Sequence, residues 1–438
     1  MKKSRKAVSV VFTYKKEIFS IVRQNYLRAF PGYTAFPGGK VDRADKVDES
    51  LETTLLNTVK REMQEELKID IEALKASGKI HSIRQFAKAT SPSFNPYIYE
   101  TYFYRIDLTE KLEFELDLNE ARAGEWLDPS SLLRDYNFGK RLVIYPIKKV
   151  IESFNEDFGF QHFLGFDRDR NESIPMIEPM RNFIQIMPLS NTLPPAERTN
   201  AFVLGDEVKL IVDPSPKDIE EYRLVLEKIK NYKIEKVFIT HHHGDHHQYA
   251  SDLASYLNVP IMLSEDTYQR CLKVYGENYF GDNTIEFAKE GDVVGTWLKR
   301  KIIVLEVPGH DRGHLALASE KLEWCIVGDL FQGIGTVVVG GEEGDMLAYF
   351  KSLEKVIELS PKSVTPSHGI TLGGTHIIEK TLEHRKQRER DIKRLHLDGL
   401  SMDDILDKLY FEIPKRLRPY AMANIKSHLK KLRKEKEI

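Results

Sequence analysis

Five histidines and one aspartate are concentrated in the stretch FITHHHGDHHQYA, which runs from Phe238 to Ala250. Neutral imidazole is the commonest metal ligand among side chains, and carboxylates often accompany it. Five imidazoles cannot all reach one ion, because zinc in proteins usually takes about four ligands in all. The chemistry that this pattern indicates is hydrolysis, since a bound divalent ion lowers the pKa of water from about 15.7 towards 7.

A buried strand, KVFIT, is predicted to end at Thr240 and to position the cluster. Residues that follow the carboxyl end of a strand in an α/β fold face a cleft. His241 and His243 are two apart on an extended turn and can therefore point the same way, while Asp245 and His246 begin a helix and face inward. The resulting pattern is His-x-His-x-Asp-His.

Other ligand-type residues follow strand-like runs farther along the chain. These are Asp213 in LIVDP, His310 in PGHDRGH, Asp329 in WCIVGDLF and His368 in TPSHG. In their order, the five motifs resemble those of the metallo-β-lactamase superfamily.

The superfamily resemblance implies a dinuclear centre with assigned ligands. One ion would be bound by His241, His243 and His310, the second by Asp245, His246 and His368, with Asp329 bridging them and Asp213 and His314 lying behind the ligands. His242 and His247 would be bystanders, with His242 at a surface or substrate-side position. Nitrogen and oxygen ligands without thiolate suit two Zn²⁺, or Mn²⁺ or Fe²⁺ in a more octahedral site.

The segments after this region narrow the resemblance. GTVVVGGEEGDMLAYFKSLEKV, PSHG, EHRKQRER and the terminal IKSHLKKLRKEKEI resemble the β-lactamase-like protein 2 family. That family has an endoribonuclease member, so the resemblance implies phosphodiester cleavage of single-stranded RNA and a small winged-helix-like domain at the C-terminus. Glyoxalase II-like relatives use the same kind of site on thioesters, so a thioester hydrolase, acting for example on acyl-CoA, is the alternative.

The C-terminal segment is strongly basic. From Pro414 to Ile438 there are nine Lys or Arg residues and two Glu residues, an excess of seven positive charges. Such a surface either contacts phosphates or is a solvated helix face, and the sequence leaves both readings open.

A second candidate metal site lies near the N-terminus. A helix is predicted from Glu49 to Leu67, because apolar residues recur every four positions and form one stripe. Glu62, Glu65 and Glu66 lie at i, i+3 and i+4, on a flank beside that stripe. Clustered carboxylates need a counter-ion, and Mg²⁺ or Mn²⁺ carried on a diphosphate substrate would supply it.

These carboxylates, with FPGGK and Arg61, resemble the Nudix box, and the segment Leu27–Lys40 is similar to that of coenzyme A diphosphatase-type Nudix proteins. The resemblance implies that Arg61 orients the carboxylates and that backbone N–H groups of Gly38 and Gly39 approach phosphate. It also implies a nucleotide or CoA-type small-molecule substrate. The third possibility is a non-catalytic, ligand-sensing module.

Three departures from the Nudix pattern bear on its activity. The stretch between Gly39 and Arg61 is roughly eight residues longer than in the box. Thr53 stands where a Glu is expected, which leaves Glu52 or Glu49 as substitutes. Lys68 stands where a Gly is usual.

The chain as a whole is predicted to be an α/β protein of several domains, since 438 residues exceed one ordinary domain. Three domains are expected: a Nudix α/β/α sandwich at 1–155, a metallo-β-lactamase αββα sandwich at 185–375 and a winged-helix-like domain at 398–438. A linker at 156–184 and a connecting helix at 376–397 would join them. A capping box from Ser401 to Asp404 is predicted to begin a helix of the last domain.

Composition favours a cytoplasmic location without membrane contact. No apolar run approaches the roughly 20 residues that a membrane helix needs, and the first residues read as a strand rather than a signal peptide. Cys271 and Cys325 are too few for a disulfide framework or a thiolate zinc site. The net charge of −2 does not commit the whole chain to nucleic acid.

Overall fold

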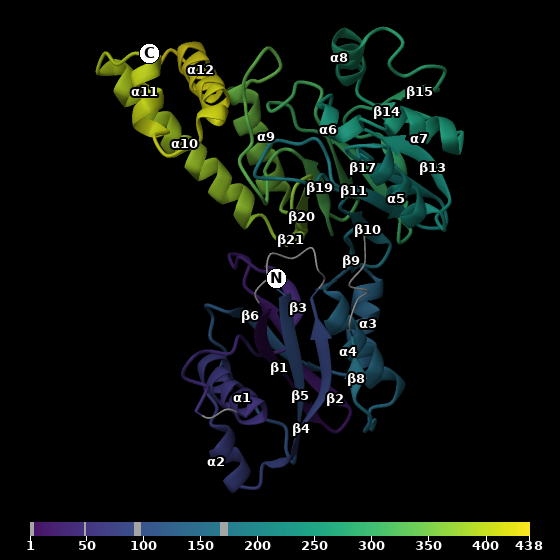
Figure 1. The fold of residues 1–438 in the computed structure, drawn as a ribbon, viewed down its shortest axis with the longest axis vertical. Helices are drawn as coiled ribbons and strands as arrows, with labels where there is room; N and C mark the ends of the chain where they lie inside the picture. The colour runs from purple at the N-terminus through teal and green to yellow at the C-terminus, as the bar shows by residue number, and fades with distance from the viewer. Residues whose placement is uncertain (1–3, 48–49, 92–97, 167–173) are drawn as a thin grey trace. The chain divides into compact units, whose positions relative to one another are not determined.

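The computed structural model describes residues 4–47, 50–91, 98–166 and 174–438 (Figure 1). The chain divides into two compact units, residues 1–181 and 182–438. Part of the predicted linker, residues 167–173, lies outside the described residues. The predicted division into three domains, a linker and a connecting helix stays a prediction, and each unit is described by itself.

The N-terminal unit is built on a mixed sheet. Its strands are β1 (Ser4–Tyr14), β2 (Glu17–Arg23), β3 (Tyr33–Ala35), β4 (Ile80–Thr90), β5 (Ile98–Leu108), β6 (Ala121–Leu127), β7 (Leu142–Val143) and β8 (Leu164–Gly165). The order is β7-β3-β2-β1-β5-β4-β8, and β6 pairs with β2. The central strand β1 is antiparallel to β2 and parallel to β5. One further strand of this unit, β9 (Met176–Met180), follows β8 along the chain.

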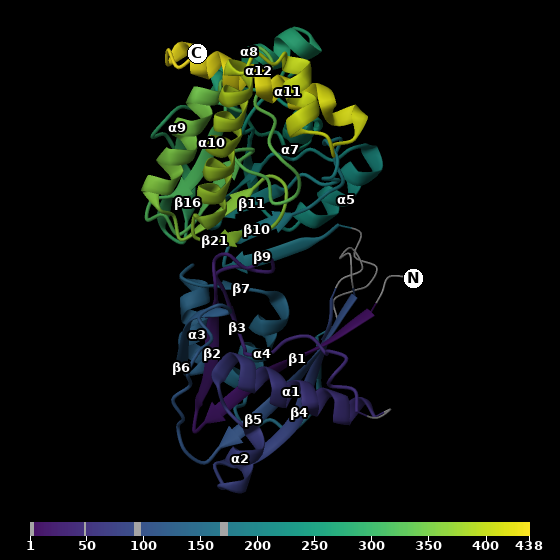
Figure 2. The same cartoon turned by 90° about the vertical axis from the view of Figure 1, so that its left-hand side faces the viewer.

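Helices cover both faces of this sheet (Figure 2). They are α1 (Leu51–Leu67), α2 (Ile71–Ala76), α3 (Pro129–Asn137) and α4 (Tyr145–Glu156). Alternation along β1 sends Val8, Val10 and Phe12 into the core beneath α1, and Val11 into the core beneath α3 and α4. The predicted α/β/α sandwich is confirmed.

The C-terminal unit contains two sheets packed face to face. The first runs β15 (Ile285–Phe287), β14 (Ile261–Leu263), β13 (Ile234–Phe238), β12 (Lys209–Val212), β11 (Ala201–Gly205) and β10 (Phe183–Ile186). The second runs β16 (Val293–Trp297), β17 (Arg300–Glu306), β18 (Leu315–Ser319), β19 (Cys325–Gly328), β20 (Ser363–Pro366) and β21 (Leu372–Gly373). In the core between them, Phe183 of the first sheet contacts both Phe202 of the same sheet and Trp324, which directly precedes β19 of the second.

Helices flank both sheets, which confirms the predicted αββα sandwich. The helices are α5 (Ile219–Ile229), α6 (Gly244–His247), α7 (Ala250–Leu257), α8 (Glu265–Tyr275), α9 (Met346–Leu359) and α10 (His376–Leu397). Strands β12, β13 and β14 are parallel, as are β19 and β20. Because carboxyl ends of parallel strands share an edge, the segments after β12, β13, β19 and β20 are brought to one side of the sandwich.

The chain ends in a small helical module. It consists of α11 (Met402–Leu409), a 3-10 turn (Lys415–Leu417) and α12 (Arg418–Lys434), which pack with α10 around Ile392, Ile405 and Ile425. The capping box predicted at Ser401 and Asp404 is confirmed. In the described part of the chain, every helix is too short or too polar to traverse a bilayer.

Candidate metal centres

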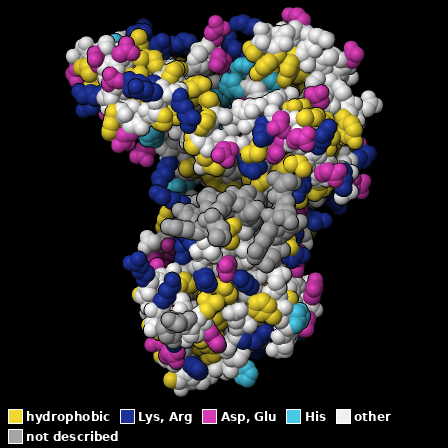
Figure 3. Space-filling model, viewed as in Figure 1, with side chains coloured by type: hydrophobic (Ala, Val, Ile, Leu, Met, Phe, Trp, Pro, Cys, Tyr) yellow, Lys and Arg dark blue, Asp and Glu magenta, His cyan; other side chains and the backbone are white. Residues whose placement is uncertain are grey.

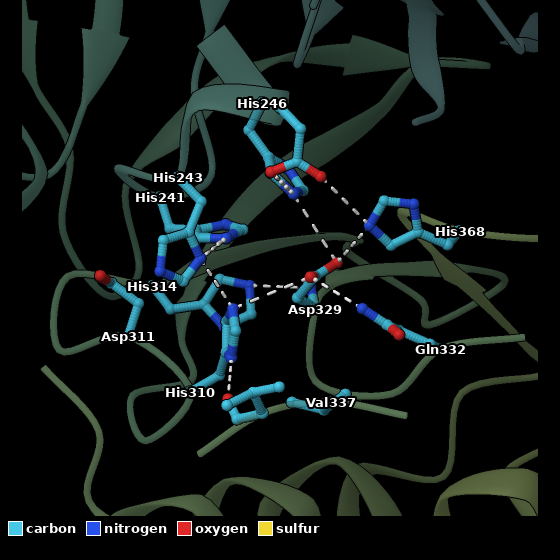
Figure 4. A network of polar contacts seen from close by, with 12 residues as sticks. His241, His243, His246, His310, Asp311, His314, Asp329, Gln332, Val337 and His368 are labelled. Carbon is cyan, nitrogen blue, oxygen red and sulfur yellow. Dashed lines mark hydrogen bonds and ion pairs between the residues drawn. The ribbon is translucent and has the colours of Figure 1, made fainter. Parts of the chain in front are cut away.

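His241, His243 and His310 turn ring nitrogens towards one point (Figure 4). His243 Nδ1 lies 3.0 Å from His241 Nε2 and 3.0 Å from His310 Nε2. These distances are close to the roughly 3.3 Å edge of a tetrahedron whose metal–nitrogen bonds are about 2.0–2.1 Å. Two of these imidazoles come from the segment between β13 and α6 and the third from the segment between β17 and β18, and together they form one wall of a candidate ion site.

The other ring nitrogens fix the tautomers of these histidines. Thr240 Oγ1 donates to Asp213 Oδ2 over 2.7 Å, so its lone pair accepts from His241 Nδ1 at 3.0 Å. His310 Nδ1 donates to the carbonyl of Val338 over 2.6 Å. Both Nε2 atoms are consequently left with a lone pair directed into the site, which is the form that binds metal.

Asp245, His246 and His368 form a second group of ligand atoms. His368 Nε2 lies 3.6 Å from Asp245 Oδ2, and His246 Nε2 lies 3.8 Å from Asp245 Oδ1. The Nδ1 atoms are used elsewhere: that of His246 donates to Asp213 Oδ2 over 2.9 Å, and that of His368 donates to the carbonyl of Arg198 over 2.8 Å.

Asp329 lies between the two groups. Its Oδ1 is 3.5 Å from His368 Nε2 and 3.8 Å from His246 Nε2, while its Oδ2 is 3.8 Å from His310 Nε2. Gln332 Nε2 donates to Oδ2 over 3.2 Å and holds the carboxylate in this orientation. One carboxylate thus faces both candidate ion positions.

Buried atoms without partners show that this site fits a cation. In the described part of the chain, His246 Nε2, His368 Nε2 and Asp329 Oδ1 are buried and make no hydrogen bond. A buried polar atom left unpaired costs on the order of 1–3 kcal/mol, and three facing one another are costly unless an ion binds them. Nitrogen and carboxylate donors without thiolate suit Zn²⁺, Mn²⁺ or Fe²⁺.

The charges in the site agree with this reading. Burial and the neighbouring histidines lower the pKa of His241 far below its usual range and that of His310 to about 4, so both are neutral ligands near pH 7. Burial opposes the charged form of His246, yet the surrounding carboxylates raise its pKa to about 10. Burial likewise opposes ionisation of Asp329, but the histidines around it keep its pKa well below the usual range. The second position therefore attracts positive charge.

Asp213 supports both groups from behind. It is fully buried and accepts from Thr240 N over 2.8 Å as well as from Thr240 Oγ1 and His246 Nδ1. It has φ of +46°, directly after β12, and that backbone conformation carries its carboxylate under the next strand end.

Replacement of Asp213 by asparagine is expected to weaken binding of the second ion by about 10–100-fold, the usual cost of losing an outer partner of a ligand. Asparagine retains the volume but cannot accept from all three donors at once. Zinc titration against a chelating indicator would measure the change. Equal affinities in both proteins would contradict this role for Asp213, and Asp252→Asn at an exposed position is the matched control.

Three further histidines lie close to the centre. His314 is buried, and its Nε2 accepts from the backbone N–H of Asp329 over 3.3 Å, so it lies behind that carboxylate. The predicted surface position for His242 is wrong, because His242 is 9% exposed and pairs through Nδ1 with buried Asp311, while the substrate-side alternative stays a prediction. His247 is buried, with its two nitrogens bonded to Tyr279 Oη and the carbonyl of His242.

The structure adds residues that the sequence did not single out. Asp311 follows His310 in PGHDRGH, and its carboxylate was the available signal. Gln332 and the Val338 carbonyl gave no signal, because their roles arise from tertiary contacts.

The centre opens to solvent beside His243, whose side chain is 31% exposed. Histidines are visible in a hollow of this unit in the space-filling view (Figure 3). Glu343 Oε1 lies 4.0 Å from His243 Nε2, and the interaction with that histidine lowers the pKa of Glu343 to about 2. Half-exposed Tyr275 lies at the same mouth, with its hydroxyl over Gly244. A substrate can therefore approach from this side.

The three predicted carboxylates of the N-terminal unit all lie on α1. Glu62 and Glu66 are buried, and Glu65 is exposed. Arg61 Nη1 lies 2.9 Å from both Glu62 Oε1 and Glu65 Oε2, and Gly38 N donates to Glu66 Oε2 over 2.9 Å. Burial raises the pKa of Glu66 to about 8, and the nearby Glu62 adds to this effect. Two buried carboxylates of this kind fit a hard, oxygen-seeking cation.

Asp45 is a member of this site that the sequence did not indicate. It is 3% exposed and accepts from Arg61 Nε and Nη2, each over 3.0 Å, and from Thr58 Oγ1 over 3.0 Å. Arg61 Nη2 also donates to the carbonyl of Lys40 over 2.8 Å. The enlarged loop between Gly39 and Arg61 thus supplies a carboxylate that orients the arginine.

The Gly38–Gly39 turn packs tightly against its surroundings. A Cβ on Gly38, whose φ is +142°, would lie 2.3 Å from the carbonyl oxygen of Val8, and a Cβ on Gly39 would lie 2.3 Å from Glu62 Oε1. Only glycine allows the turn to approach this closely. In this structure the Gly38 amide contacts Glu66, where the sequence suggested phosphate.

The departures from the Nudix pattern have local explanations. Lys68 adopts the left-handed conformation, φ 56°, that ends α1 and that glycine usually takes. Thr53 lies in the first turn of α1, and its N–H donates to the side chain of the N-cap residue, Ser50 Oγ. Glu52 is exposed, and Glu49 lies outside the described residues.

Three family models match separate parts of the chain. Residues 194–368 match the metallo-beta-lactamase superfamily, residues 3–145 match the NUDIX domain, and residues 401–438 match the beta-lactamase associated winged helix domain.

Individual proteins match the C-terminal half. A "Beta-lactamase-like protein 2 homolog" of Caenorhabditis elegans is 29% identical over 251 residues, which is 54% of this chain and 79% of that protein. A "Hydroxyacylglutathione hydrolase" of Baumannia cicadellinicola is 29% identical over 168 residues, 37% of this chain and 56% of that protein. The crystal structure of a beta-lactamase domain protein from Burkholderia ambifaria aligns with a TM-score of 0.50 at 22% identity, covering 59% of this chain and 87% of that one, which supports the fold.

Proposed function

Because the chain is a hydrolase that combines a metallo-β-lactamase domain, a Nudix domain and a β-lactamase-associated winged-helix domain, we propose that its C-terminal unit cleaves phosphodiester bonds of single-stranded RNA. The observation that carries the hydrolytic part is the pair of ligand groups that share Asp329. The ligands would be His241, His243 and His310 for one Zn²⁺ and Asp245, His246 and His368 for the other, with Asp329 between them; Mn²⁺ or Fe²⁺ are the alternatives.

The bound ions would polarise the scissile bond and acidify water. The chain's own residues hold this machinery in place. Asp213 and the Val338 carbonyl keep His246 and His310 in the tautomers that bind, and Gln332 orients Asp329. Tyr275 stays protonated, because burial raises the pKa of its phenol, and its hydroxyl at the mouth is available to donate to the substrate.

A basic face on α12 supports RNA as the substrate. Lys426, Lys430 and Arg433 are exposed and lie at i, i+4 and i+7, on one side of the helix. Among the described residues, none of the three is ion-paired with an acidic side chain. These charges belong to the same compact unit as the metal centre, and they are free to contact phosphates.

Removing this face is expected to weaken RNA binding and its salt dependence together. In Lys426→Ala/Lys430→Ala/Arg433→Ala, the slope of log K against log salt should fall in magnitude by about 2, since each phosphate contact on a single strand contributes about 0.7. Fluorescence anisotropy with a labelled single-stranded oligonucleotide at several salt concentrations measures it. An unchanged slope would show that the face is merely solvated.

Thioester hydrolysis is the second candidate, favoured by the similarity to a protein named hydroxyacylglutathione hydrolase. Zinc-loaded protein should be offered single-stranded RNA and acyl-CoA in parallel, with His243→Ala as the inactive reference. The proposal expects RNA cleavage that His243→Ala abolishes. Turnover of acyl-CoA alone, lost in the same variant, would replace the nuclease function by a thioesterase.

For the N-terminal unit we propose hydrolysis of a nucleoside diphosphate-linked substrate such as CoA. Glu62, Glu65 and Glu66 would hold Mg²⁺ or Mn²⁺, and Arg61 and Asp45 would keep the carboxylates oriented. The alternative is a ligand-sensing module that binds the same substrate without cleaving it. That alternative is favoured by the contacts of Arg61, which already neutralises two of the three carboxylates.

A further inference from the structure

Three consecutive residues of the loop between β19 and α9 are each held by a different partner. The carbonyl of Val337 accepts from Arg385 Nη2. The carbonyl of Val338 accepts from His310 Nδ1 over 2.6 Å, and the N–H of Val339 donates to Asn424 Oδ1 over 2.9 Å. The candidate metal ligand His310 and the helices α10 and α12 therefore all hydrogen-bond to the same segment, residues 337–339.

The side chains of α10 and α12 that bind this segment are buried, and α12 packs closely against it. Asn424 on α12 and Arg385 on α10 are 5% and 4% exposed, and Arg385 Nη1 donates to Asn424 Oδ1 over 3.3 Å. A Cβ on Gly340 would lie 2.6 Å from Cβ of Ala423, so the helix and the loop pack without intervening side-chain atoms. A side chain at position 340 would therefore clash with α12.

The other side of the His310 turn is fixed by α9. Gly309 has a φ of +134°, and a Cβ there would lie 2.2 Å from the backbone nitrogen of Tyr349. Asp345 N donates to the carbonyl of Gly309 over 2.9 Å, and Ser352 Oγ donates to that of Pro308 over 2.7 Å. The backbone of His310 is thus fixed from one direction, and its ring is oriented from the other through Val338.

The orientation of the Val338 carbonyl decides what His310 can bind. While it accepts from Nδ1, the proton stays on that atom and Nε2 keeps its lone pair for an ion. If the carbonyl turned away, burial of the ring would leave Nδ1 without an acceptor and the other tautomer would compete. Because Asn424 and Arg385 fix the peptide units on either side of Val338, they control that orientation.

We infer that Asn424 of the C-terminal helical module and Arg385 of α10 are positioning residues for the metal centre, which together set the tautomer and orientation of His310. The inference rests on the proposed dinuclear centre and adds a role for the winged-helix domain that is independent of nucleic acid. If the inference holds, the metal affinity of the position that includes His310 depends on contacts made by α12.

Zinc titration of the full-length protein against a chelating indicator tests the inference. Asn424→Ala should weaken one of the two binding steps by about 10-fold, at the lower end of the cost of losing an outer partner, and leave the other step unchanged. Asn424→Asp keeps an oxygen that accepts from Val339 N and from Arg385, so it should retain the wild-type affinity in both steps. Asp403→Asn, at an exposed position of α11, is the control.

The outcomes separate this inference from the proposed function. Two zinc steps in the wild type, with one weakened in Asn424→Ala and preserved in Asn424→Asp, support it. Two steps that are identical in all variants overturn it and leave the dinuclear centre standing. Equal weakening of both steps with a lowered melting temperature overturns it in favour of general destabilisation, and no zinc binding by the wild type overturns the centre itself.

Discussion

Replacement of Asp329 by asparagine is expected to abolish hydrolysis by the C-terminal unit and to reduce bound zinc from about two equivalents to about one or fewer. Asparagine has nearly the same volume, but it carries no charge and only one acceptor oxygen. It cannot face His310 with one carboxylate oxygen and His246 and His368 with the other. Loss of a direct ligand should cost more than the roughly 100-fold that an outer partner can cost.

Metal content by mass spectrometry and turnover of the substrate that the wild type accepts measure this prediction. Asp252→Asn, the same substitution at an exposed site on α7, controls for the change of charge. Normal turnover with two zinc ions in Asp329→Asn would contradict the shared-ligand arrangement. Normal turnover with one zinc would instead assign the reaction to a single ion.

The grouping of the candidate ligands was predictable because these residues follow strands. His241, His243, Asp245 and His246 are close in sequence, and a strand followed by a turn positions them by local geometry alone. Asp329 and His368 follow β19 and β20, whose parallel pairing brings their ends to the same edge. Motif order and strand ends therefore indicated both the fold and the group of candidate ligands.

The supporting contacts were not predictable, since each joins residues that are distant in sequence. In the sequence His242 stands between two candidate ligands and has no evident role, yet in the structure its ring pairs with Asp311 in the interior. Asn424 reaches Val339 across 85 positions, and no local pattern reports such a contact. Asp45 lies in the enlarged loop, which is a departure from the Nudix pattern. In sequence this loop suggests a damaged site, whereas in the structure it supplies the carboxylate that binds Arg61.

Glu66→Gln is expected to stabilise the metal-free N-terminal unit at high pH while abolishing its response to Mg²⁺. Burial raises the pKa of Glu66 from 4.5 to about 8, so folding favours the protonated form. The stability that this provides is fully present below pH 4.5 and is lost as the pH rises through 8. Above pH 8 this raised pKa corresponds to a penalty on the order of 4–5 kcal/mol in the free energy of unfolding, which glutamine removes.

Denaturant titrations of the full-length protein, read by hydrogen exchange in peptides from β1 and α1, would measure this unit by itself. The variant should be more stable than the wild type at pH 8.5 and similar to it at pH 4. Glu113→Gln, at an exposed position, should change neither value. Lower stability of Glu66→Gln at pH 8.5 would show that the charged carboxylate is already stabilised without metal.

Mg²⁺ supplies the decisive comparison for this site. A cation held by Glu66 binds only the folded unit, so Mg²⁺ should stabilise the wild type at pH 8.5 and leave Glu66→Gln unchanged. Hydrolysis of CoA or nucleoside diphosphates should fall by at least about 100-fold in the variant. Equal stabilisation of both proteins by Mg²⁺ would remove Glu66 from the ligand set. A wild type that binds Mg²⁺ and CoA without cleaving it would assign the unit to sensing, because the same carboxylates would then hold a ligand that the chain does not hydrolyse.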